Sequence, residues 1–407
     1  MRVLLAHNSY QQSGGEDAVV ANERALLANG GCDVDLLHIH NDEITSFWHK
    51  LSTTINLTAS ARGKKLMADA IERFRPDVVH VHNFFPLLTA SIYDACRDAG
   101  VPVVQTLHNY RLTCAGAMLF RDGGPCEDCI HGSPYQAALH GCYRGSRAGS
   151  LAVARMIDVH RRNNTWNARV DRFIALTRFA KGRYVAAGIE PARIAVKPNF
   201  VPDPGRMLPG AHPPRSGALF VARLAPEKGL GTLLKGWQGL AVPLTIIGDG
   251  PLKDVAVAGS GGSITYRGRQ PALEVQAAMR SAAFLVMPSE SYETFGMVSV
   301  EAFANGLPVI ASRLGAMAEI ISDGKNGLLF RPGDAADLAD KVRFVVSRPD
   351  VLRTLSEGAR ATYEAQYTPQ VNLRALLAIY EGVLKERHGL NPAQDSVATA
   401  RTRLAAS

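Results

Sequence analysis

Two glutamates eight positions apart, Glu293 and Glu301, are the residues whose type and setting point most directly to chemistry. A short turn, Thr294-Phe295-Gly296, lies between them, after an apolar run typical of a buried strand and at the start of a predicted helix. Carboxylates at the loop edge of a parallel sheet can accept hydrogen bonds from paired hydroxyls, such as those of a ribose or a hexose. The helix N-terminus beside them offers free N–H groups to a phosphate. The alternative, two solvated acids, is disfavoured because apolar segments bracket them closely.

A pair of cations in a second predicted loop suits the same phosphate. Arg223 and Lys228 stand in the segment RLAPEKG, between a predicted strand and a predicted helix. An arginine binds phosphate oxygens in a bidentate manner, and a lysine adds a point charge. The segment therefore predicts a diphosphate clamp. The alternative is that the two residues are unconnected surface cations. Pro226 and Gly229, which shape the loop, disfavour that alternative.

Polar or flexible residues also follow predicted strands in the first half. Gly14 and Gly15 follow the apolar run RVLLAH, and glycine lets backbone N–H groups approach a phosphate closely, although many first turns need glycine for steric reasons alone. His108 follows the run VPVVQTL, where an imidazole can donate to a hydroxyl or phosphate. The alternative for His108 is satisfaction by nearby backbone. For His80 and His82 we predict a structural role.

Short apolar runs alternate with amphipathic stretches, which predicts an α/β protein built from doubly wound parallel sheets. A chain of 407 residues is too long for one ordinary core, so we expect two Rossmann-like domains facing a central cleft. The first loop lacks the Gly-x-Gly-x-x-Gly spacing of dinucleotide-binding enzymes. The predicted divisions are a first domain at 1–198 with a cysteine-bearing insert at 110–145, a Pro- and Gly-rich linker at 199–216, a second domain at 217–366, a return helix at 367–388 and a disordered tail at 389–407.

A cluster of cysteines marks the first half, at Cys114, Cys126, Cys129 and Cys142. The middle pair has C-x2-C spacing, and four thiolates so spaced can hold a tetrahedral Zn²⁺. We expect a structural zinc that pins the turn-like segment between them. The alternative is a loop with buried free thiols, since disulfides are not expected in the cytoplasm.

Composition bounds the class of protein. Apolar residues make up 46% and charged residues 20% of the chain, as in ordinary globular proteins. No apolar run approaches the ~18–20 residues of a membrane-spanning helix, and the first residues do not resemble a signal peptide, so we expect a cytoplasmic protein.

The net charge of +8 is unevenly distributed, with ten cations and two aspartates between Cys142 and Arg183. This basic belt suits anionic lipid headgroups or a pyrophosphate-linked acceptor, and a solvated face is an equal alternative. The belt holds few aromatic residues to stack bases, so we predict no nucleic-acid partner.

The motifs of the second half resemble family 4 of the retaining GT-B glycosyltransferases, including a bacterial subgroup with a cysteine-bearing insert. The E-x7-E pair, RLAPEKG, Gly-Asp-Gly-Pro and NGLLF-x-PGD carry the resemblance, which extends more loosely over the first half. The catalytic residues it implies are His108, Glu293, Arg223 and Lys228. The donor-binding residues it implies are Gly14, Gly15, Arg223, Lys228, Gly250, Glu293, Thr294, Phe295, Gly296 and Glu301.

The resemblance also implies a role for each group. The cations take up the charge of a leaving diphosphate, Glu301 binds ribose hydroxyls, and Glu293 and His108 contact the donor sugar. The implied reaction moves a hexose from a UDP- or GDP-sugar to a glycan or lipid-linked saccharide, in exopolysaccharide or lipopolysaccharide synthesis. No catalytic metal is expected, and the protein would lie in the cytoplasm or on the inner membrane face. A sugar-nucleotide 2-epimerase and a non-catalytic nucleotide-sugar-binding protein are the alternatives.

Overall fold

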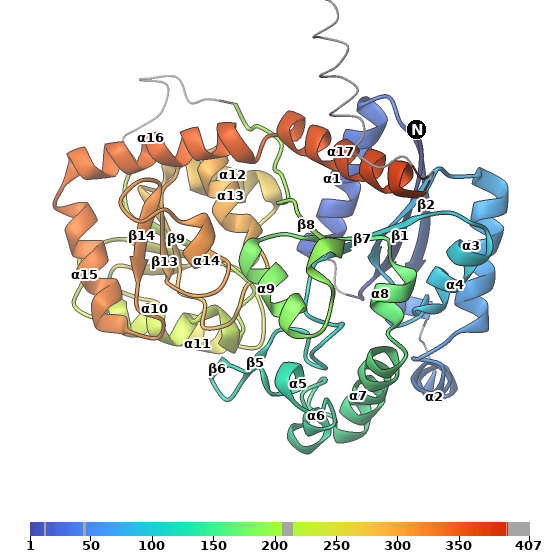
Figure 1. Cartoon of the computed structure of the whole chain (residues 1–407). Coiled ribbons are helices and arrows are strands. Elements are labelled where there is room, and N and C mark those ends of the chain that lie inside the picture. Colours follow the sequence, from blue (N-terminus) through green and yellow to red (C-terminus); the bar gives the residue numbers. More distant parts are fainter. Residues whose placement is uncertain (12–13, 44–45, 206–214, 388, 390–407) are drawn as a thin grey trace, which may run out of the picture.

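Two six-stranded parallel sheets, each covered by helices, make up the protein (Figure 1). The computed structural model describes residues 1–11, 14–43, 46–205, 215–387 and 389. The predicted α/β fold class with two doubly wound domains is confirmed. None of the helices in these described ranges combines the length and apolarity that crossing a bilayer requires.

The first sheet has the strand order β2-β1-β3-β4-β7-β8. Its strands are β1 (Arg2–Ser9), β2 (Asp33–His40), β3 (Val78–Asn83), β4 (Val103–Leu107), β7 (Arg172–Ala175) and β8 (Ile194–Val196). The central strands are buried nearly throughout because helices cover both faces of the sheet. The helices of this half are α1 (Gly15–Asn29), α2 (Phe47–Ile55), α3 (Ala61–Phe74), α4 (Ser91–Asp98), α5 (Asp128–His131), α6 (Gln136–His140), α7 (Arg147–Arg162), α8 (Thr165–Arg169) and α9 (Arg178–Ala186).

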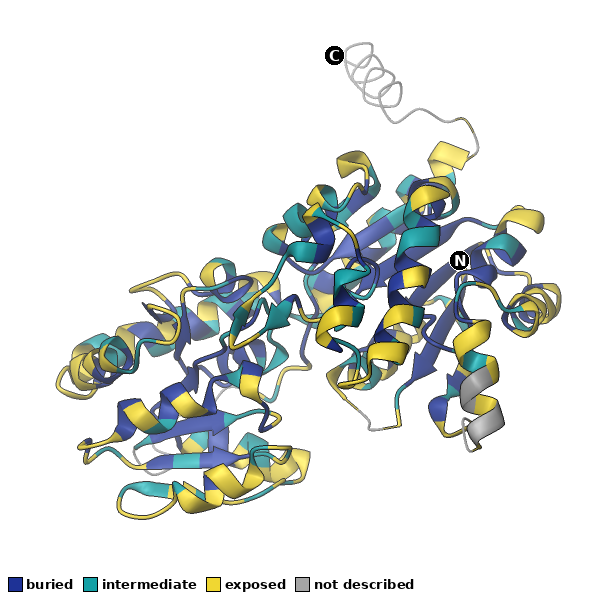
Figure 2. Ribbon diagram, turned by 90° about the horizontal axis from the view of Figure 1, so that it is seen from below, coloured by how far each residue is buried: buried dark blue, intermediate teal, exposed yellow. Residues whose placement is uncertain are grey.

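The second sheet has the order β11-β10-β9-β12-β13-β14. Its strands are β9 (Ala218–Val221), β10 (Leu244–Ile247), β11 (Ile264–Tyr266), β12 (Phe284–Met287), β13 (Val309–Ser312) and β14 (Gly327–Phe330). The helices of this half are α10 (Leu230–Trp237), α11 (Lys253–Ala258), α12 (Ala272–Ser281), α13 (Met297–Ala304), α14 (Met317–Ile320), α15 (Ala335–Val346) and α16 (Pro349–Gln366). Figure 2 shows the buried strands enclosed by helices whose outer faces are exposed.

The chain ends its described course back on the first domain. The last helix, α17 (Pro369–Arg387), follows α16 closely and lies over the first sheet (Figure 1). Leu376, Tyr380 and Val383 of α17 pack in one core cluster with Val3 and Leu5 of β1. The predicted return helix thus has its counterpart in α17, whereas the predicted tail lies, apart from residue 389, outside the described residues.

Three segments of the first domain have local structure that matters for its surface. The segment after β2 contains α2. Helix α4 begins only at Ser91, because Thr89 has a φ of 58° that a right-handed helix cannot contain. The turn-like cysteine segment forms the turn of a small hairpin, β5 (Phe120–Arg121) with β6 (Gly124–Pro125). Asp122 and Gly123 connect its strands with φ of 51° and 80°, as a two-residue primed turn requires.

Candidate active site

A cleft of about 1200 Å³ lies between the two domains, where loops after strands of both sheets meet. Open α/β sheets bind ligands at this edge because helix N-termini and loop backbone groups converge there. The structure brings most of the predicted site residues to this cleft. Its lining includes Gly14, Gly15, His108, Arg223, Lys228, Gly250, Glu293, Thr294, Phe295 and Gly296.

Glu301 lies in an adjoining cavity and not in the main cleft. This second cavity has a volume of about 770 Å³ and is lined largely by α12 and the start of the interdomain segment. Gly15 and Met297 line both cavities, so the two spaces adjoin. Burial raises the pKa of the Glu301 carboxyl group above its ordinary value. A ligand that reached both glutamates would therefore have to extend past Met297.

The two predicted cations each contact a carboxylate. Nζ of Lys228 donates to Oε1 of Glu293 at 2.6 Å, and the hydroxyl of Ser289 donates to the same oxygen at 2.9 Å. The guanidinium of Arg223 contacts the buried Glu227. Burial alone would raise the pKa of Glu293, but Lys228 and Ser289 hold it below its ordinary value. Glu293 is therefore an ionised acceptor at neutral pH.

Two glycines in the second domain let these loops approach one another. Gly229 has a φ of 72°, and a Cβ there would lie 1.8 Å from the carbonyl oxygen of Pro288. Gly296 has a φ of 83°, and its Cβ would lie 2.4 Å from the methyl group of Met317. Glycine at these positions is thus required by the fold.

Gly14 and Gly15 differ from this pattern. A Cβ added to either one would meet nothing within 4 Å, and neither has a positive φ. The packing of the protein therefore does not require glycine here, while a side chain would project into space beside the cleft that Gly14 and Gly15 line.

Contacts across the cleft join the two halves of the site. The hydroxyl of Thr294 donates to the carbonyl oxygen of His108 at 2.8 Å, and the hydroxyl of Thr177 donates to the carbonyl oxygen of Thr294 at 3.2 Å. Glu319 accepts hydrogen bonds from the first two backbone N–H groups of α9, at 3.0 and 2.9 Å. The loop that carries the first glutamate of the E-x7-E pair is thus fixed against the strand end that carries His108.

The sequence prediction missed Glu16 and Glu23. Glu16 lines the cleft, where burial and, next, the charge of Asp17 raise its pKa to about 8. Glu23 lies on the buried face of α1, four residues after Val19 and four before Leu27. An acid at this helical spacing among apolar residues is the sequence signal that identifies it.

His80 and His82 are buried, and their partners are side chains. The nitrogens of His80 lie 2.7 Å from the hydroxyl of Tyr380 and 2.8 Å from that of Thr106. Nδ1 of His82 lies 2.9 Å from Nε2 of His108. His82 thus reaches the candidate site through His108, a connection that the predicted structural role did not include.

The four cysteines lie near one another without forming a compact group. Burial and the neighbouring thiols Cys114, Cys142 and Cys126 raise the pKa of Cys129 to about 12. Within the described ranges, the one set of three or more His, Cys, Asp or Glu side chains with ligand atoms mutually within 4.8 Å is Glu23, His80 and His82. No three of the cysteine sulfurs therefore lie mutually within that limit.

An Asp-x-Asp spacing occurs at Asp33 and Asp35, at the start of β2. Asp33 pairs with Arg2 at 3.3 Å and Asp35 with Arg73 at 2.8 Å. Both aspartates lie near the end of the sheet opposite the cleft, because Arg2 opens β1 whereas the glycine loop follows its last residue. They are not placed to bind a metal at the candidate site.

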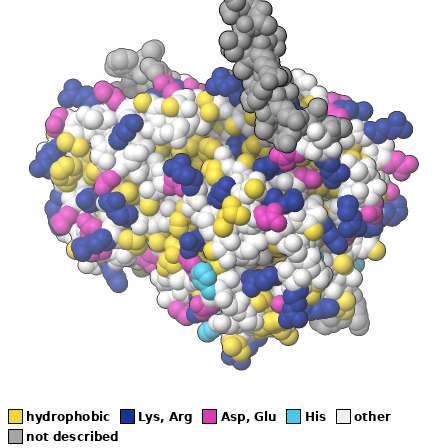
Figure 3. Space-filling model, viewed as in Figure 1, with side chains coloured by type: hydrophobic (Ala, Val, Ile, Leu, Met, Phe, Trp, Pro, Cys, Tyr) yellow, Lys and Arg dark blue, Asp and Glu magenta, His cyan; other side chains and the backbone are white. Residues whose placement is uncertain are grey.

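The predicted basic belt is largely used within the protein. Arg162, Arg169, Arg172, Arg178 and Arg183 form ion pairs with acidic side chains. Arg161 and Lys181 donate to backbone carbonyl groups. Arg147 and Arg155 remain exposed on α7, on either side of the exposed Leu151. Figure 3 shows basic and hydrophobic side chains together at the bottom of the view, where Figure 1 places α6 and α7.

Two family models match the chain. Residues 14–203 match a model described as "Glycosyltransferase Family 4", and residues 215–348 match one described as "Glycosyl transferases group 1". An uncharacterized glycosyltransferase of Methanocaldococcus jannaschii is 37% identical over 35% of this chain and 41% of its own length. A phosphatidyl-myo-inositol mannosyltransferase of Mycobacterium leprae is 36% identical over 42% of this chain and 48% of its own length.

A solved structure shares the fold over almost the whole chain. HepE of Anabaena, crystallised with UDP-glucose, has a TM-score of 0.64 at 17% identity, covering 94% of this chain and 100% of its own. In the first three curated relatives, the matched region spans 41%, 38% and 48% of the relative's length, less than half in each.

Proposed function

Because the chain belongs to the glycosyltransferases of family 4 and group 1, with a GT-B fold, we propose that it transfers a hexose from a nucleotide-diphosphate sugar to a saccharide acceptor. The transfer would retain the anomeric configuration and use no catalytic metal. The observation that carries the proposal is the convergence of Arg223, Lys228 and Glu293 on one interdomain cleft, with Glu301 in the adjoining cavity. The UDP-glucose bound to HepE makes a UDP-sugar the first donor to test.

The two adjoining cavities match the parts of such a donor. The diphosphate would lie against Arg223, Lys228 and the N-terminus of α13, where the charge of the leaving group is stabilised. The ribose would extend past Met297 to Glu301, and the hexose would lie between Glu293 and His108. On binding, phosphate oxygens would take over contacts that Glu227 and Glu293 now make with the two cations.

In the mechanism that we propose, the departing phosphate oxygen accepts the proton of the acceptor hydroxyl as the new glycosidic bond forms. The arginine and lysine stabilise the negative charge that develops when the bond from the sugar to the phosphate breaks. The paired loops position the sugar and limit the approach of water. No side chain is required as a covalent nucleophile.

A thermal-shift screen of UDP-, GDP- and ADP-sugars tests the donor assignment. One nucleotide class should raise the melting temperature, and Glu301→Ala should weaken binding by about 10- to 100-fold, because two ribose hydrogen bonds to a carboxylate are lost. Glu274→Ala on the nearby helix α12 is the control, since that carboxylate is exposed. Normal binding by Glu301→Ala would contradict the ribose assignment.

Product analysis with the preferred donor separates the candidate activities. A retaining transferase releases the nucleoside diphosphate and gives a product with the donor's anomeric configuration, which NMR reports directly. The transfer rate should not depend on added Mg²⁺ or Mn²⁺. An altered sugar nucleotide formed without any acceptor would instead show the 2-epimerase, and binding without turnover would show a non-catalytic protein.

For the acceptor, we propose a lipid-linked saccharide of exopolysaccharide or lipopolysaccharide synthesis, reached from the inner membrane face. The exposed stripe of Arg147, Leu151 and Arg155 on α7 offers an apolar contact between two cations to an anionic lipid surface. Vesicles with anionic lipid should bind the protein more strongly than neutral vesicles. The double variant Arg147→Glu with Arg155→Glu should abolish that difference. If the double variant binds anionic vesicles as strongly as the wild type, the stripe is not the membrane contact.

We also propose that the four cysteines hold a structural zinc ion, which would draw the sulfurs together around the β5–β6 hairpin. Metal analysis of the purified protein should find about one zinc per chain. Cys126→Ser should remove it and lower the melting temperature, whereas Cys32→Ser should not. Zinc-free protein with unchanged stability would contradict the proposal.

A further inference from the structure

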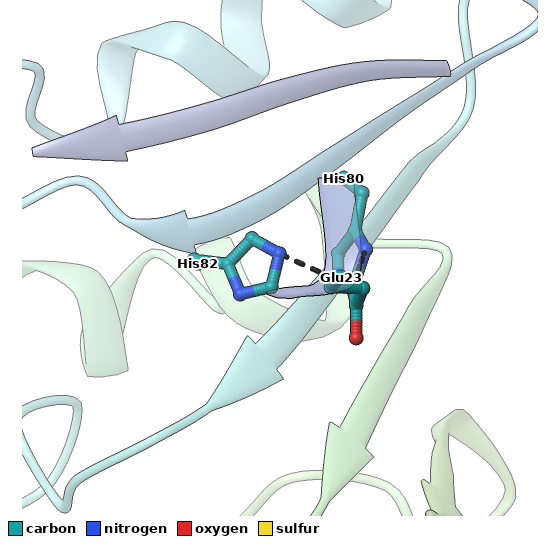
Figure 4. Close-up of side chains that lie close together, drawn as sticks. All are labelled: Glu23, His80 and His82. Atoms are coloured by element: carbon teal, nitrogen blue, oxygen red, sulfur yellow. Dashed lines mark ion pairs between the residues drawn. The ribbon is translucent and has the colours of Figure 1, made fainter. Parts of the chain in front are cut away.

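Glu23 of α1 is buried beside two histidines of β3 (Figure 4). Its Oε1 atom lies 3.0 Å from Nδ1 of His80 and 3.2 Å from Nε2 of His82. Its Oε2 atom lies 3.3 Å from the ammonium group of Lys197, which also donates to Asn372 at 2.9 Å. The cluster thus joins the first helix, a central strand, the residue after β8 and the last helix.

These distances alone would also suit a metal ion, but the bonding of the cluster favours protons. Lys197 already supplies a positive charge to the Glu23 carboxylate. Both nitrogens of His80 have hydroxyl partners, and Nδ1 of His82 is occupied by His108. A divalent ion would have to displace several of these contacts and lie close to an ammonium group, which is electrostatically unfavourable.

The protonation of the cluster follows from its charges. Burial would raise the pKa of Glu23, but Lys197 and the two histidines hold it well below its ordinary value, so the carboxylate is ionised. Burial lowers the pKa of His82 to about 4 and lowers that of His108 well below its ordinary value. Both imidazoles are therefore neutral at pH 7, and each carries one proton.

A neutral pair of imidazoles joined by one hydrogen bond has two proton arrangements. In one, His82 carries its proton on Nε2, facing Glu23, and its bare Nδ1 accepts from Nε2–H of His108. In the other, both protons shift, and a bare Nε2 of His82 faces the carboxylate at 3.2 Å. Two lone pairs so close repel, so the charge of Glu23 selects the first arrangement.

We propose that Glu23 and His82 are positioning residues that fix the tautomer of His108, so that its bare Nδ1 accepts a hydrogen bond from a hydroxyl of the donor sugar. The inference rests on the proposed function for the identity of that ligand, but the tautomer itself does not depend on it. His108 lines the cleft while its Nε2 is bound to His82, which leaves Nδ1 as the ring nitrogen available to a ligand. Because a bare Nδ1 can only accept a hydrogen bond, a sugar hydroxyl at this point must point its own hydrogen toward His108.

Long-range ¹⁵N–¹H NMR of the full-length protein labelled with ¹⁵N-histidine tests the tautomer without any substrate. The His108 signals are identified by their loss in His108→Gln. The expected result is a protonated Nε2 and a bare Nδ1 on His108. A proton on Nδ1 in the wild-type protein would overturn the proposal, whatever the variants do.

The variant Glu23→Gln tests the cause. In this variant Lys197, which can only donate, should hold the amide oxygen, so that the amide N–H donates to Nε2 of His82; both protons should then shift and His108 should carry its proton on Nδ1. Because this change leaves Lys197 without a counter-charge, the double variant Glu23→Gln with Lys197→Met serves if the single variant does not fold. An unchanged tautomer in the folded variant would overturn the role of Glu23.

Tyr380→Phe is the matched control, because it removes a partner of His80 at the same cluster and leaves the path from Glu23 to His108 intact. In this variant the His108 tautomer and the transfer rate should stay those of the wild type. Glu23→Gln should instead lower the transfer rate about tenfold or more, as the loss of a partner of a functional histidine typically does. If the tautomers are as expected and no donor is turned over, the proposed function fails and the positioning role stands. If the protein transfers the sugar but His108 carries its proton on Nδ1, the positioning role fails and the proposed function stands.

Discussion

Two lysine–glutamate pairs serve the cleft in different ways. Lys197 and Glu23, in the first domain, are 1% and 2% exposed and pair at 3.3 Å. Lys228 and Glu293, in the second domain, are 24% and 13% exposed and pair at 2.6 Å. The first pair is sealed behind His82 and α17, whereas the second lines the cavity itself.

The difference separates preorganisation from ligand binding. A sealed pair cannot exchange partners, so its charges can only set the protonation and position of neighbouring groups such as His82. A pair at the cavity wall can open, and its lysine can turn to a phosphate. We therefore expect changes in the first pair to act on folding and, through His82, on the proton of His108, whereas changes in the second should act mainly on turnover through the loss of a ligand contact.

The largest effect on stability is expected from Lys197→Met. Removing the ammonium group leaves the ionised Glu23 buried without its counter-charge, which should cost on the order of 3–5 kcal/mol in the free energy of unfolding. Urea unfolding monitored by circular dichroism measures the change. Lys197→Met combined with Glu23→Gln should recover much of the loss, and a single variant as stable as the wild type would show that the buried pair is not ionised.

Lys228→Met should give the opposite profile. The pair is partly exposed and Glu293 keeps its bond to Ser289, so the free energy of unfolding should change by about 1 kcal/mol or less. The transfer rate should fall about 100-fold or more, because the charge of the leaving diphosphate loses a partner. Lys235→Met, an exposed lysine on α10, is the control for charge alone. Full activity in Lys228→Met would show that Lys228 does not bind the diphosphate.

Glycine substitutions in the two domains should also separate an effect on ligand binding from an effect on stability. Gly15→Ala should leave the melting temperature nearly unchanged, since its Cβ meets no protein atom within 4 Å, but should weaken donor binding by about tenfold through contact with the ligand. Gly229→Ala should destabilise the second domain by more than about 1 kcal/mol, because its Cβ collides with Pro288. Equal donor affinity in Gly15→Ala and wild type would place the ligand away from the first loop.

The smallest effect on stability, and the one that depends most on pH, is expected from Glu16→Gln. Its pKa is about 8 in the folded protein and close to 4.5 when unfolded, so the folded state holds an extra proton between these values. The stability it contributes is present below about 4.5 and is lost as the pH rises toward 8. Melting temperatures measured from pH 5 to 8.5 should therefore show Glu16→Gln gaining on the wild type as the pH rises. A constant difference would contradict the raised pKa.

The second half of the site could be predicted from sequence because its chemistry is local. Arg223 and Lys228 share one loop, Glu293 and Glu301 flank one turn, and glycines with positive φ mark where those loops bend. Short-range patterns of this kind are visible without the fold.

The first half of the site could not be predicted in the same way. His80 meets Tyr380 across 300 positions of sequence, and Glu23 meets Lys197 across 174. Only the crossing of α1, β3, β8 and α17 brings them together, so His82 carried no local signal of its link to His108. Glu301 lies on a helix, as the sequence predicted. Its place in a separate cavity could not be predicted, because the division of the site into two cavities depends on how α12 packs.

A crystal structure of the protein with UDP-glucose, or with whichever sugar nucleotide the thermal-shift screen selects, would show how the donor lies in the cleft. We expect diphosphate oxygens within hydrogen-bonding distance of Arg223 and Lys228, the ribose at Glu301, and the hexose between Glu293 and His108. A nucleotide bound elsewhere, with Lys228 still paired to Glu293, would contradict this arrangement.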